Sequence, residues 1–271
     1  MLAEWLTYLT TPCPRHLREM GYLRELIALR ARYRRCRRGW TKHLDRCRGL
    51  IAEAARASTR RRKAVVLGSG LLHDIPLADL GCLFGEVVLV DLMHLRAARR
   101  KARGLANVRF LDRDLTGVVK AIHAHVHVNA GGPLPLPAPG GLPEDDADLV
   151  VSANILSQLP LLPAQYLERQ SRRHSGQEIA DFSRALIQHH LAALADVSGT
   201  VCLITEVDRQ IRDGGKTLGS EDPLHGVPIP LKGKEWIWDI APRPEMDGAY
   251  DLRYRVIGGY WNFRNSSRAA P

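Results

Sequence analysis

The feature that most constrains the fold of this chain is a regular alternation of short apolar runs with longer helix-like segments. The runs are AVVL (64–67), EVVLV (86–90), NVRFL (107–111), ADLVV (147–151) and TVCLIT (200–205), and each is followed by a glycine or a polar residue. Helix-like segments lie between them, at 73–84, 93–104, 116–125 and 177–197. Strands of a parallel sheet are buried on both faces and read as continuous apolar runs. The alternation therefore predicts an α/β fold with a parallel sheet covered by helices.

The last part of the chain departs from this alternation. Two strand-like segments, EWIWDI (235–240) and DLRYRVIGGYW (251–261), are separated only by the turn-prone link APRPEMDGAY. Strands joined by so short a link pair antiparallel, so we expect a terminal hairpin after the five parallel strands. The Pro/Gly-rich stretch 129–146 and the stretch 213–234 are predicted to be loops.

The region 15–57 reads as helical, and Gly39 is expected to divide it into two helices. Its apolar residues recur at helical spacing, which predicts one face packed against a core. The stripe consists of Trp40, Leu44, Cys47, Ile51 and Ala54. We predict an N-terminal helical cap over residues 1–62 and one α/β domain over 63–271.

The positive charge of the chain is concentrated in this N-terminal region. Between Arg15 and Lys63 there are 17 lysines and arginines against four acidic residues, whereas the whole chain has a net charge of +10. Such asymmetry indicates an anionic partner at Arg30–Lys63, either nucleic acid, a membrane surface or an acidic substrate. The alternative is a solvated arginine-rich helix face that binds nothing.

Composition excludes several classes. No apolar run approaches the roughly 18 residues of a membrane span, and the N-terminus does not read as a signal peptide. Five widely spaced cysteines without a C-x-x-C pair indicate reduced thiols, so we expect a cytoplasmic protein. His123, His125 and His127 alternate and could chelate a metal from one face of a strand. No further ligand cluster supports this, and we expect no bound metal. The pair 189–190 (His-His) is expected on the surface of a helix.

A nucleotide pocket is predicted where the first two strands end. Gly68-Ser69-Gly70 follows the first strand, and glycines allow both a sharp turn and a close approach of a ligand. Asp91 ends the second strand, 21 residues after Gly70, where a carboxylate can accept the hydroxyl protons of a ribose. A dinucleotide site would need Gly or Ala three residues after Gly70, but His73 stands there, which argues against NAD.

The series AVVLGSGLL, EVVLVDL, NVRFLDRDL and ADLVVSANILSQLP resembles motifs I to IV of the class I S-adenosylmethionine-dependent methyltransferases. The final hairpin resembles the sixth and seventh strands of that family. The resemblance spans about residues 64–261 and implies a Rossmann-like, seven-stranded, mostly parallel sheet with an antiparallel terminal hairpin, and S-adenosyl-L-methionine as cofactor.

The resemblance also implies roles for individual residues. Gly68, Ser69 and Gly70 would border the methionine part of the cofactor, and Asp91 would hold the ribose hydroxyls. Leu92 would pack on the adenine, Asp114 would accept from the adenine amino group and Leu115 would lie beside it. Ser152 and Asn154 would lie near the methyl group and the substrate. These are expectations from the family pattern, residue by residue.

Two positions depart from the family pattern. Val66 stands where the family usually has an acidic residue, and Leu72 replaces the third glycine of the loop. Both changes affect the methionine end of the cofactor, where His73 or Asp74 could supply a replacement polar contact. These departures favour an alternative function, a non-catalytic scaffold that has kept the fold and docks an anionic partner through its basic helices.

Methyl transfer requires alignment of the acceptor with the methyl group more than a dedicated acid–base pair. Asn154 is the candidate to orient the acceptor, although it is as readily a helix cap. Glu206 is the candidate general base, with hydrated strand-end carboxylates at 206 and 208 as the alternative. An Asp/Asn-Pro-Pro-aromatic tetrapeptide is missing after strand four, so methylation of a base amino group is not indicated.

We therefore expect methyl transfer from S-adenosyl-L-methionine to an acceptor of one of two classes. A small molecule is favoured over RNA, because the arginines are not interleaved with the aromatic platform that single strands use. Lid candidates in the N-terminal region are Tyr22, Tyr33, Trp40 and His43. The aromatic residues of the terminal hairpin are expected to pack a core, with one of them closing the substrate cavity.

Overall fold

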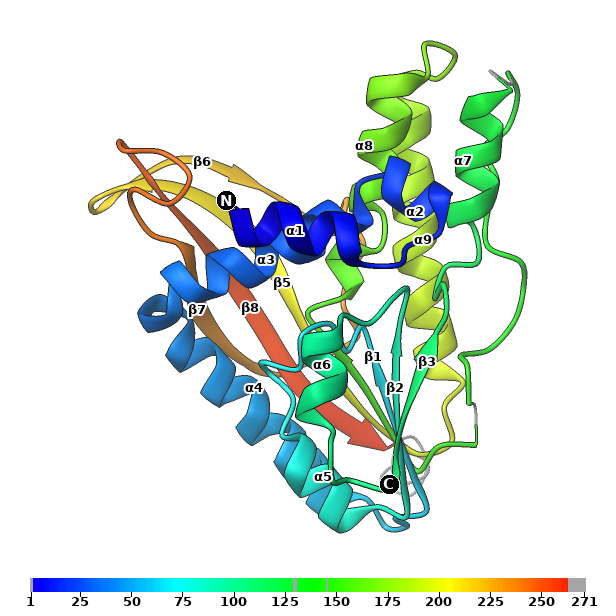
Figure 1. Ribbon diagram of the computed structural model, residues 1–271, viewed down its shortest axis with the longest axis vertical. Coiled ribbons are helices and arrows are strands. Elements are labelled where there is room, and N and C mark those ends of the chain that lie inside the picture. The colour runs from blue at the N-terminus through cyan, green and yellow to red at the C-terminus, as the bar shows by residue number, and fades with distance from the viewer. Residues whose placement is uncertain (1, 129–130, 145, 263–271) are drawn as a thin grey trace, which may run out of the picture.

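The computed structural model of the protein describes residues 2–128, 131–144 and 146–262, and within them a central eight-stranded sheet (Figure 1). The strands are β1 (Lys63–Leu67), β2 (Glu86–Asp91), β3 (Val108–Asp112), β4 (Leu149–Ala153), β5 (Thr200–Asp213), β6 (Lys216–Glu221), β7 (Lys234–Ala241) and β8 (Asp251–Asn262). The apolar runs of the sequence form β1 to β5, because only extended segments buried on both sides tolerate such continuous hydrophobicity.

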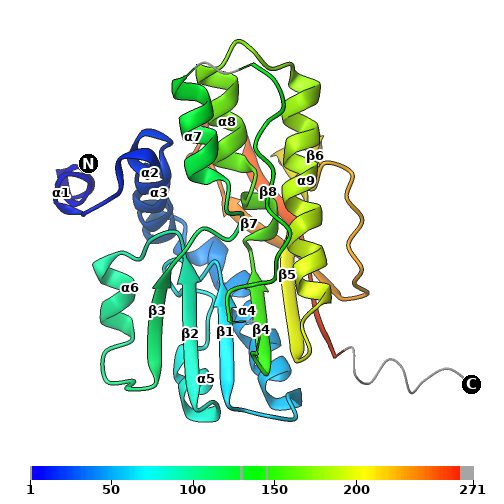
Figure 2. The same ribbon diagram turned by 90° about the vertical axis from the view of Figure 1, so that its right-hand side faces the viewer.

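The strand order is β3-β2-β1-β4-β5-β8-β7, with β1 to β5 parallel and β8 antiparallel to both of its neighbours (Figure 2). This order confirms the predicted Rossmann-like sheet with an antiparallel terminal hairpin. The direction of chain progression reverses between β1 and β4. In open α/β sheets ligands bind beyond the carboxyl ends of the strands at such a reversal.

The predicted loop 213–234 is partly wrong. Strand β5 continues to Asp213, and the segment KTLGSE forms β6, which pairs antiparallel with the outer half of β5. All but one residue of β6 is exposed. An exposed edge strand such as β6 needs no apolar alternation, which is why the sequence pattern did not reveal it. In the other predicted loop, 129–146, the described residues contain no helix or strand, and residues 129, 130 and 145 lie outside the described part.

Helices cover both faces of the sheet. In β1, Ala64 and Val66 face the main core beneath α4 (Arg37–Ala57) and α5 (Leu77–Leu83). Val65 and Leu67 face the opposite core beneath α9 (Gly176–Ala195). The remaining elements after β2 are α6 (Arg96–Lys101), α7 (Val119–His127), the 3-10 turn η1 (Leu156–Gln158) and α8 (Leu161–Gln170). Among the described residues no helix is both long and apolar enough to cross a membrane.

The histidine triplet lies on a helix rather than on a strand. Helix α7 spans Val119–His127, so His123 and His127 are one turn apart on the same face. His125 points elsewhere, and its Nε2 lies 2.9 Å from Nε2 of His174. The strand-face interpretation of the alternating histidines is therefore wrong, because the period that matters here is 3.6 and not 2.

The N-terminal region forms α1 (Leu2–Thr10), α2 (Arg15–Glu19), α3 (Tyr22–Arg35) and α4. The break between α3 and α4 falls at Cys36 and not at Gly39, which lies inside α4. A Cβ at Gly39 would lie 2.9 Å from the carbonyl oxygen of Asp239, so this glycine lets β7 approach the helix. Its role is close packing rather than a break in the helix.

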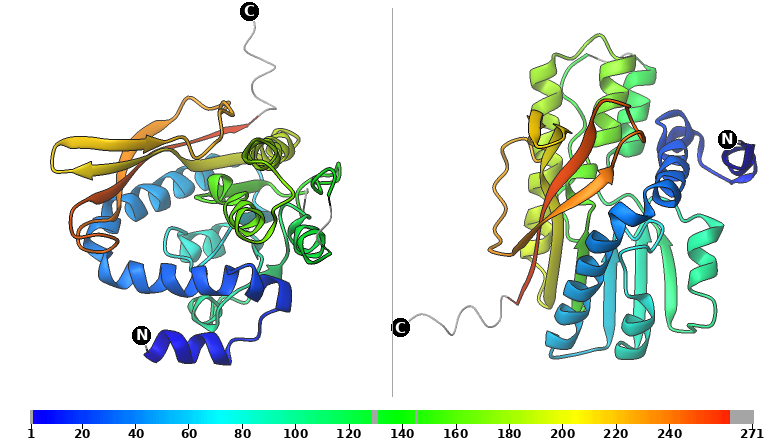
Figure 3. Two further views of the ribbon diagram at one scale, coloured as in Figure 1. Left: turned by 90° about the horizontal axis from the view of Figure 1, so that it is seen from above. Right: turned by 90° about the vertical axis from the view of Figure 1, so that its left-hand side faces the viewer.

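Helix α4 is an integral layer of the α/β body (Figure 3). Its apolar stripe is buried in the main core together with the sheet, as the helical spacing predicted. By contrast, α1 to α3 lie beyond the carboxyl ends of β1 and β2, where Leu23 and Ile27 of α3 pack on Leu71, Met93 and Leu95. The structure thus places the beginning of the sheet-covering layer at α4, inside the segment predicted as a cap.

Candidate functional site

The tips of β1 and β2 lie side by side and are joined by hydrogen bonds. The backbone N–H groups of Gly68 and Ser69 both donate to the carbonyl oxygen of Val90, at 2.9 and 3.1 Å. Gly70 N donates to Oδ2 of Asp91 at 2.7 Å, and Leu92 N donates to Oδ1 at 2.8 Å. Burial raises the pKa of Asp91, an effect that these two N–H groups oppose. Each carboxylate oxygen keeps a second lone pair for a ligand.

The loop after β1 has a left-handed backbone at several positions. Gly68 has φ of +71°, and a Cβ there would lie 2.5 Å from Cβ of Ile155. Leu72, which stands where the resembled family has glycine, has φ of +56°. Its side chain is buried in the main core, and this burial offsets the cost of a conformation that L side chains rarely adopt. The loop therefore keeps its turn in spite of the missing third glycine.

A second network joins the tips of the first three strands. Oγ of Ser69 lies 2.8 Å from Nε2 of His94, and Nδ1 of the same ring lies 2.5 Å from Oδ1 of Asp112. The His94 ring is buried, and Arg99 pairs with the far side of the Asp112 carboxylate. This network holds Ser69 in place. Sequence reasoning missed His94, whose only signal was a polar residue three positions after a strand end.

Two cavities open beside these strand tips. Asp91, Leu92, Tyr22 and Ile155 contribute to the walls of both. The smaller cavity also contains Arg113, Asp114, Leu115, Thr116, Val119, Gln158 and Leu159. Burial raises the pKa of the Tyr22 hydroxyl, and the carboxylates of Asp114 and Asp91 raise it further. Tyr22, one of the predicted lid residues, thus stands neutral between the two aspartates.

The carboxylate of Asp114 is largely used within the protein. Its Oδ1 accepts from the backbone N–H and the hydroxyl of Thr116, at 2.8 and 2.7 Å, and its Oδ2 accepts from Val119 N at 2.9 Å. Val119 is the first residue of α7, so Asp114 satisfies an N–H group that the helix leaves without an intrahelical partner. One acceptor position remains toward the smaller cavity.

The larger cavity contains a polar pair that joins two distant segments. Nδ2 of Asn154 donates to Oδ2 of Asp74 at 2.7 Å, while Oδ1 of Asn154 is buried without a hydrogen-bond partner among the described residues. Burial raises the pKa of Asp74. Asn154 has φ of +56°, a conformation that asparagine tolerates better than most residues. Both residues line the larger cavity, and the unpaired Oδ1 of Asn154 is itself buried.

Aromatic side chains form the far wall of the larger cavity, where Trp40, His43 and Trp238 meet. The rings of His43 and Trp238 stack at 3.9 Å with an interplanar angle of 3°. Trp236 donates its indole N–H to Nδ1 of His43 at 3.0 Å, which leaves the proton of the neutral ring on Nε2. Burial lowers the pKa of His43 to about 3. Three of the four lid candidates, Tyr22, Trp40 and His43, thus line the larger cavity, whereas Tyr33 is not among its lining residues.

Two candidate residues lie away from the cavities. Ser152 is fully buried, and its hydroxyl lies 2.9 Å from Nε2 of His190 on α9. Since neighbouring strand residues face opposite sides, Ala153 reaches the larger cavity and Ser152 does not. His190 was expected on the surface, but it is 1% exposed, because its side of α9 packs on the sheet. Glu206 is buried in an ion pair with Arg209 at 3.0 Å.

Many basic side chains of the N-terminal region are paired within the protein. Arg35 contacts Glu245 through two hydrogen bonds, Arg62 contacts Asp148, and Lys63 contacts both Glu144 and Asp146. A different group, Arg30, Arg34 and Arg100, has no ion pair within the described ranges. Burial lowers the pKa of Arg30, and the charges of Arg34 and Arg100 lower it further. These three arginines form one group of unpaired positive charge between α3 and α6.

No protein-family model matches the chain, and no curated protein matches it either. Among solved structures, the overlay with a Burkholderia thailandensis 1,6-didemethyltoxoflavin N1-methyltransferase covers 92% of both chains, at 14% identity and a TM-score of 0.37. A DhpI complex with SAH overlays on 86% of this chain and 95% of its own, at 15% identity and a TM-score of 0.34. With YcgJ from Bacillus subtilis the match covers 58% of this chain and half of the other, at 13% identity and a TM-score of 0.30. Overlays this loose carry no argument about function.

Proposed function

We propose that the protein transfers a methyl group from S-adenosylmethionine to a small-molecule acceptor. The observation that carries the proposal is the placement of Asp91 and the Asn154–Asp74 pair in the walls of one continuous pocket region. The first is suited to a ribose, and the second to the charged end of a methionine. The motifs of the sequence and the strand order of the sheet support the same reading.

The nucleoside end of the cofactor fits the smaller cavity. Asp91 would accept the ribose hydroxyl protons with its remaining lone pairs, and Leu92 and Leu115 would pack on the adenine. The last acceptor position of Asp114 and the hydroxyl of Tyr22 lie in the same wall. The crowding at Gly68, where any Cβ would strike Ile155, shows that the backbone approaches the opposite wall closely enough to form a narrow cradle.

The methionine end fits Asp74. In the resembled family an acidic residue stands at the position of Val66, but Val66 is fully buried in the main core. Asp74 lies in the wall of the larger cavity and has no ion pair among the described residues, and a buried carboxylate of this kind favours a cationic partner. An α-ammonium group would supply that partner. We therefore assign to Asp74 the replacement contact that the sequence left open between His73 and Asp74.

The bound cofactor supplies a methyl group already activated by its sulfonium, so the protein must chiefly hold the acceptor in line with it. Asn154 lies in the wall of the larger cavity, and its unpaired Oδ1 would accept a hydrogen bond from an acceptor O–H or N–H group and so orient it. The wall formed by Trp40, His43 and Trp238 excludes water and offers flat apolar surface. Glu206 lies outside these walls, so we no longer propose it as the base.

Calorimetric titration with S-adenosylhomocysteine tests the proposal. Wild-type protein should bind it, and Asp91→Ala should weaken binding at least tenfold, whereas Asp79→Ala, a change at an exposed aspartate on α5, should leave it unchanged. Equal affinity in all three proteins would overturn the role of Asp91, and no binding by the wild type would overturn the proposal in favour of a scaffold. Mass spectrometry of co-purified compounds would then identify the acceptor. RNA binding that weakens steeply with salt and depends on Arg30, Arg34 and Arg100 would instead indicate the RNA alternative.

A further inference from the structure

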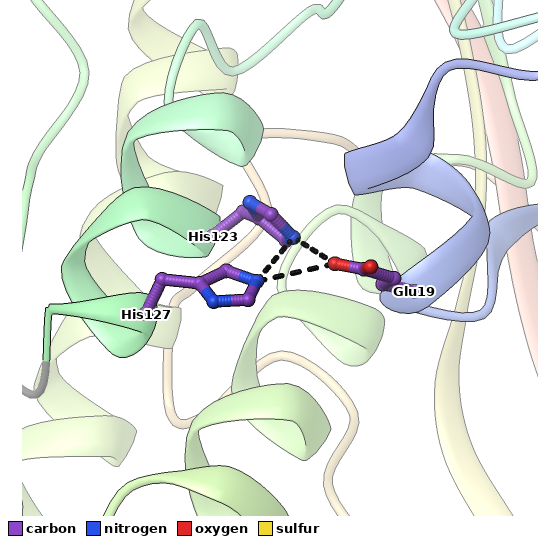
Figure 4. A group of neighbouring side chains, drawn as sticks. All are labelled: Glu19, His123 and His127. Atoms are coloured by element: carbon purple, nitrogen blue, oxygen red, sulfur yellow. Dashed lines mark hydrogen bonds and ion pairs between the residues drawn. The ribbon is translucent and has the colours of Figure 1, made fainter.

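Three potential metal ligands from two separate helices converge at the surface of the protein. Glu19 ends α2, and His123 and His127 lie one turn apart on α7 (Figure 4). Oε2 of Glu19 lies 2.6 Å from Nε2 of His123 and 3.1 Å from Nε2 of His127, and the two ring nitrogens are 3.1 Å apart. All three ligand atoms therefore point at a common centre.

Hydrogen bonds alone cannot account for all three of these short contacts. An ionised carboxylate only accepts hydrogen bonds, so each imidazole must place its proton on Nε2 to bond with Glu19. The two Nε2–H groups then face each other at 3.1 Å with no acceptor between them. At most two of the three short contacts are thus hydrogen bonds. A cation at the centre would instead be attracted to the carboxylate oxygen and to the lone pairs of both rings.

We propose that Glu19, His123 and His127 bind a divalent transition-metal ion of the zinc type. Two imidazoles and a carboxylate form a ligand set that suits zinc, and imidazole ligands disfavour magnesium and calcium. Tetrahedral bonds of about 2.0–2.2 Å separate ligand atoms by about 3.3–3.5 Å. The two contacts of 3.1 Å need to open by about 0.2–0.4 Å to reach that spacing, and the contact between Glu19 and His123 by about 0.7–0.9 Å. Water would complete the coordination on the open side, where His127 is half exposed.

The surroundings hold the ligands in place. The other oxygen of Glu19, Oε1, accepts from Nε of Arg15 at 2.7 Å, which fixes the carboxylate and leaves Oε2 for the ion. The ring of His123 lies nearly parallel to that of Tyr166, with centroids 5.9 Å apart. Leu17 and Met20 of the α2 segment pack with Val119 and Ile122 of α7 in one apolar cluster. Such supporting contacts orient metal ligands and strengthen binding.

The proposed ion would join the N-terminal segment to the α/β body beside the larger cavity. Tyr22 follows Glu19 by three residues and lines both cavities. A metal bound between α2 and α7 would therefore stabilise the segment that carries Tyr22. The site itself is independent of the proposed methyl transfer, since none of its three ligands lines either cavity.

The test is a zinc titration of the full-length protein, stripped with a chelator and carrying Cys82→Ser to remove an exposed thiol. Competition with a chromophoric chelator should show one zinc ion per chain, with affinity at least tenfold lower in His123→Ala and His127→Ala. His125→Ala is the matched control, because that ring lies on the same helix and contacts His174 instead. It should bind zinc like the parent.

A second readout covers variants that fold poorly. Zinc should raise the thermal midpoint of the parent protein but not that of Glu19→Gln, which removes one ligand charge at a partly exposed side chain. Cobalt(II) should give the intense visible absorption of a tetrahedral site in the parent only. Equal zinc affinity in the parent and in His127→Ala, loss of affinity in His125→Ala to the same extent, or an equal zinc-induced shift in Glu19→Gln would each overturn the proposal.

Discussion

The amide of Asn154, at the end of β4, donates to the carboxylate of Asp74 at 2.7 Å, although the two residues are 80 positions apart in the chain. The bond places the partly buried carboxylate of Asp74 beside the amide of Asn154 in the wall of the larger cavity. Because the usual acidic position of the resembled family is occupied by Val66, this pair carries the recognition of the methionine end in the function proposed above.

The first prediction is that Asp74→Asn weakens binding of S-adenosylhomocysteine at least tenfold. The substitution keeps the shape of the side chain but removes the charge that would pair with the α-ammonium group, and hydrogen bonds to charged groups are worth about 1.5–3 kcal/mol. Calorimetry measures the affinity. Adenosine is the control ligand, because it lacks the methionine part and should bind the variant and the wild type equally. A parallel loss for adenosine would contradict the assigned contact.

The second prediction concerns acid stability. Burial lowers the pKa of His43 to about 3, and those of His190 and His73 to about 4. In the unfolded chain these groups titrate near 6.5, so protons bind the unfolded state first as the pH falls. The contribution of these histidines to the free energy of unfolding should therefore be complete above pH 6.5. The free energy of unfolding should decline between pH 6.5 and 4, by roughly 1 kcal/mol per pH unit for each histidine.

Urea denaturation at several pH values measures this decline. His190→Gln removes one of the three groups and keeps a polar partner for Ser152, so its stability should fall less steeply with decreasing pH than that of the wild type. Identical slopes for the two proteins between pH 6.5 and 4 would show that His190 is not held neutral by its burial.

The third prediction compares two glycines of the same helix. Gly39→Ala should destabilise the protein by about 1–3 kcal/mol, because its Cβ would lie 2.9 Å from a backbone oxygen of β7. Gly49→Ala should be neutral or stabilising by up to about 1 kcal/mol, because nothing lies within 4 Å of a Cβ there and alanine favours the helix. Chemical denaturation measures the free energy of unfolding of both variants, and so shows whether close packing or helix propensity decides the effect at each glycine. A stabilised Gly39→Ala would refute the close approach of β7.

The fourth prediction concerns the boundary between cap and body. Removal of residues 1–12 deletes α1, on which Trp5, Leu6 and Leu9 are exposed, and should leave a folded, soluble protein. Removal of residues 1–62 also deletes α4 and uncovers one face of the sheet, so this shorter chain should aggregate. Size-exclusion chromatography and circular dichroism distinguish the two. A monomeric, folded fragment 63–271 would instead support the domain boundary predicted from the sequence.

The sequence was sufficient where one local pattern determined the structure. Continuous apolar runs predicted β1 to β5, and the polar residues after them predicted that Gly70 and Asp91 would meet. The apolar pattern did not reveal strand β6, because nearly all of its residues are exposed. Gly39 was expected to divide two helices, but it lies inside α4. A glycine is needed there because Asp239, 200 positions away, approaches the helix backbone closely.

The candidate site was harder to predict than the fold. Glycine turns and strand-end carboxylates follow from position along the chain, but the Asn154–Asp74 bond and the Ser69–His94–Asp112 network depend on side-chain directions that only tertiary packing sets. The same holds for Ser152, near the end of β4, and for Glu206, which lies inside the longer β5, because their side chains bond with His190 and Arg209. His123 and His127 were grouped with His125 as alternating residues of a strand, whereas on a helix only the first two share a face.

The position of α4 has a consequence for how the chain is made. Trp40 donates its indole N–H to the carbonyl oxygen of Ile240, and the helix covers strands that leave the ribosome about 200 residues after it. During synthesis the apolar stripe of α4 therefore emerges well before its partners on β7 and β8. Nascent chains with such exposed surface are prone to aggregate. We infer that the arginines on the opposite face of α4 keep this helix soluble until β7 and β8 have been synthesised.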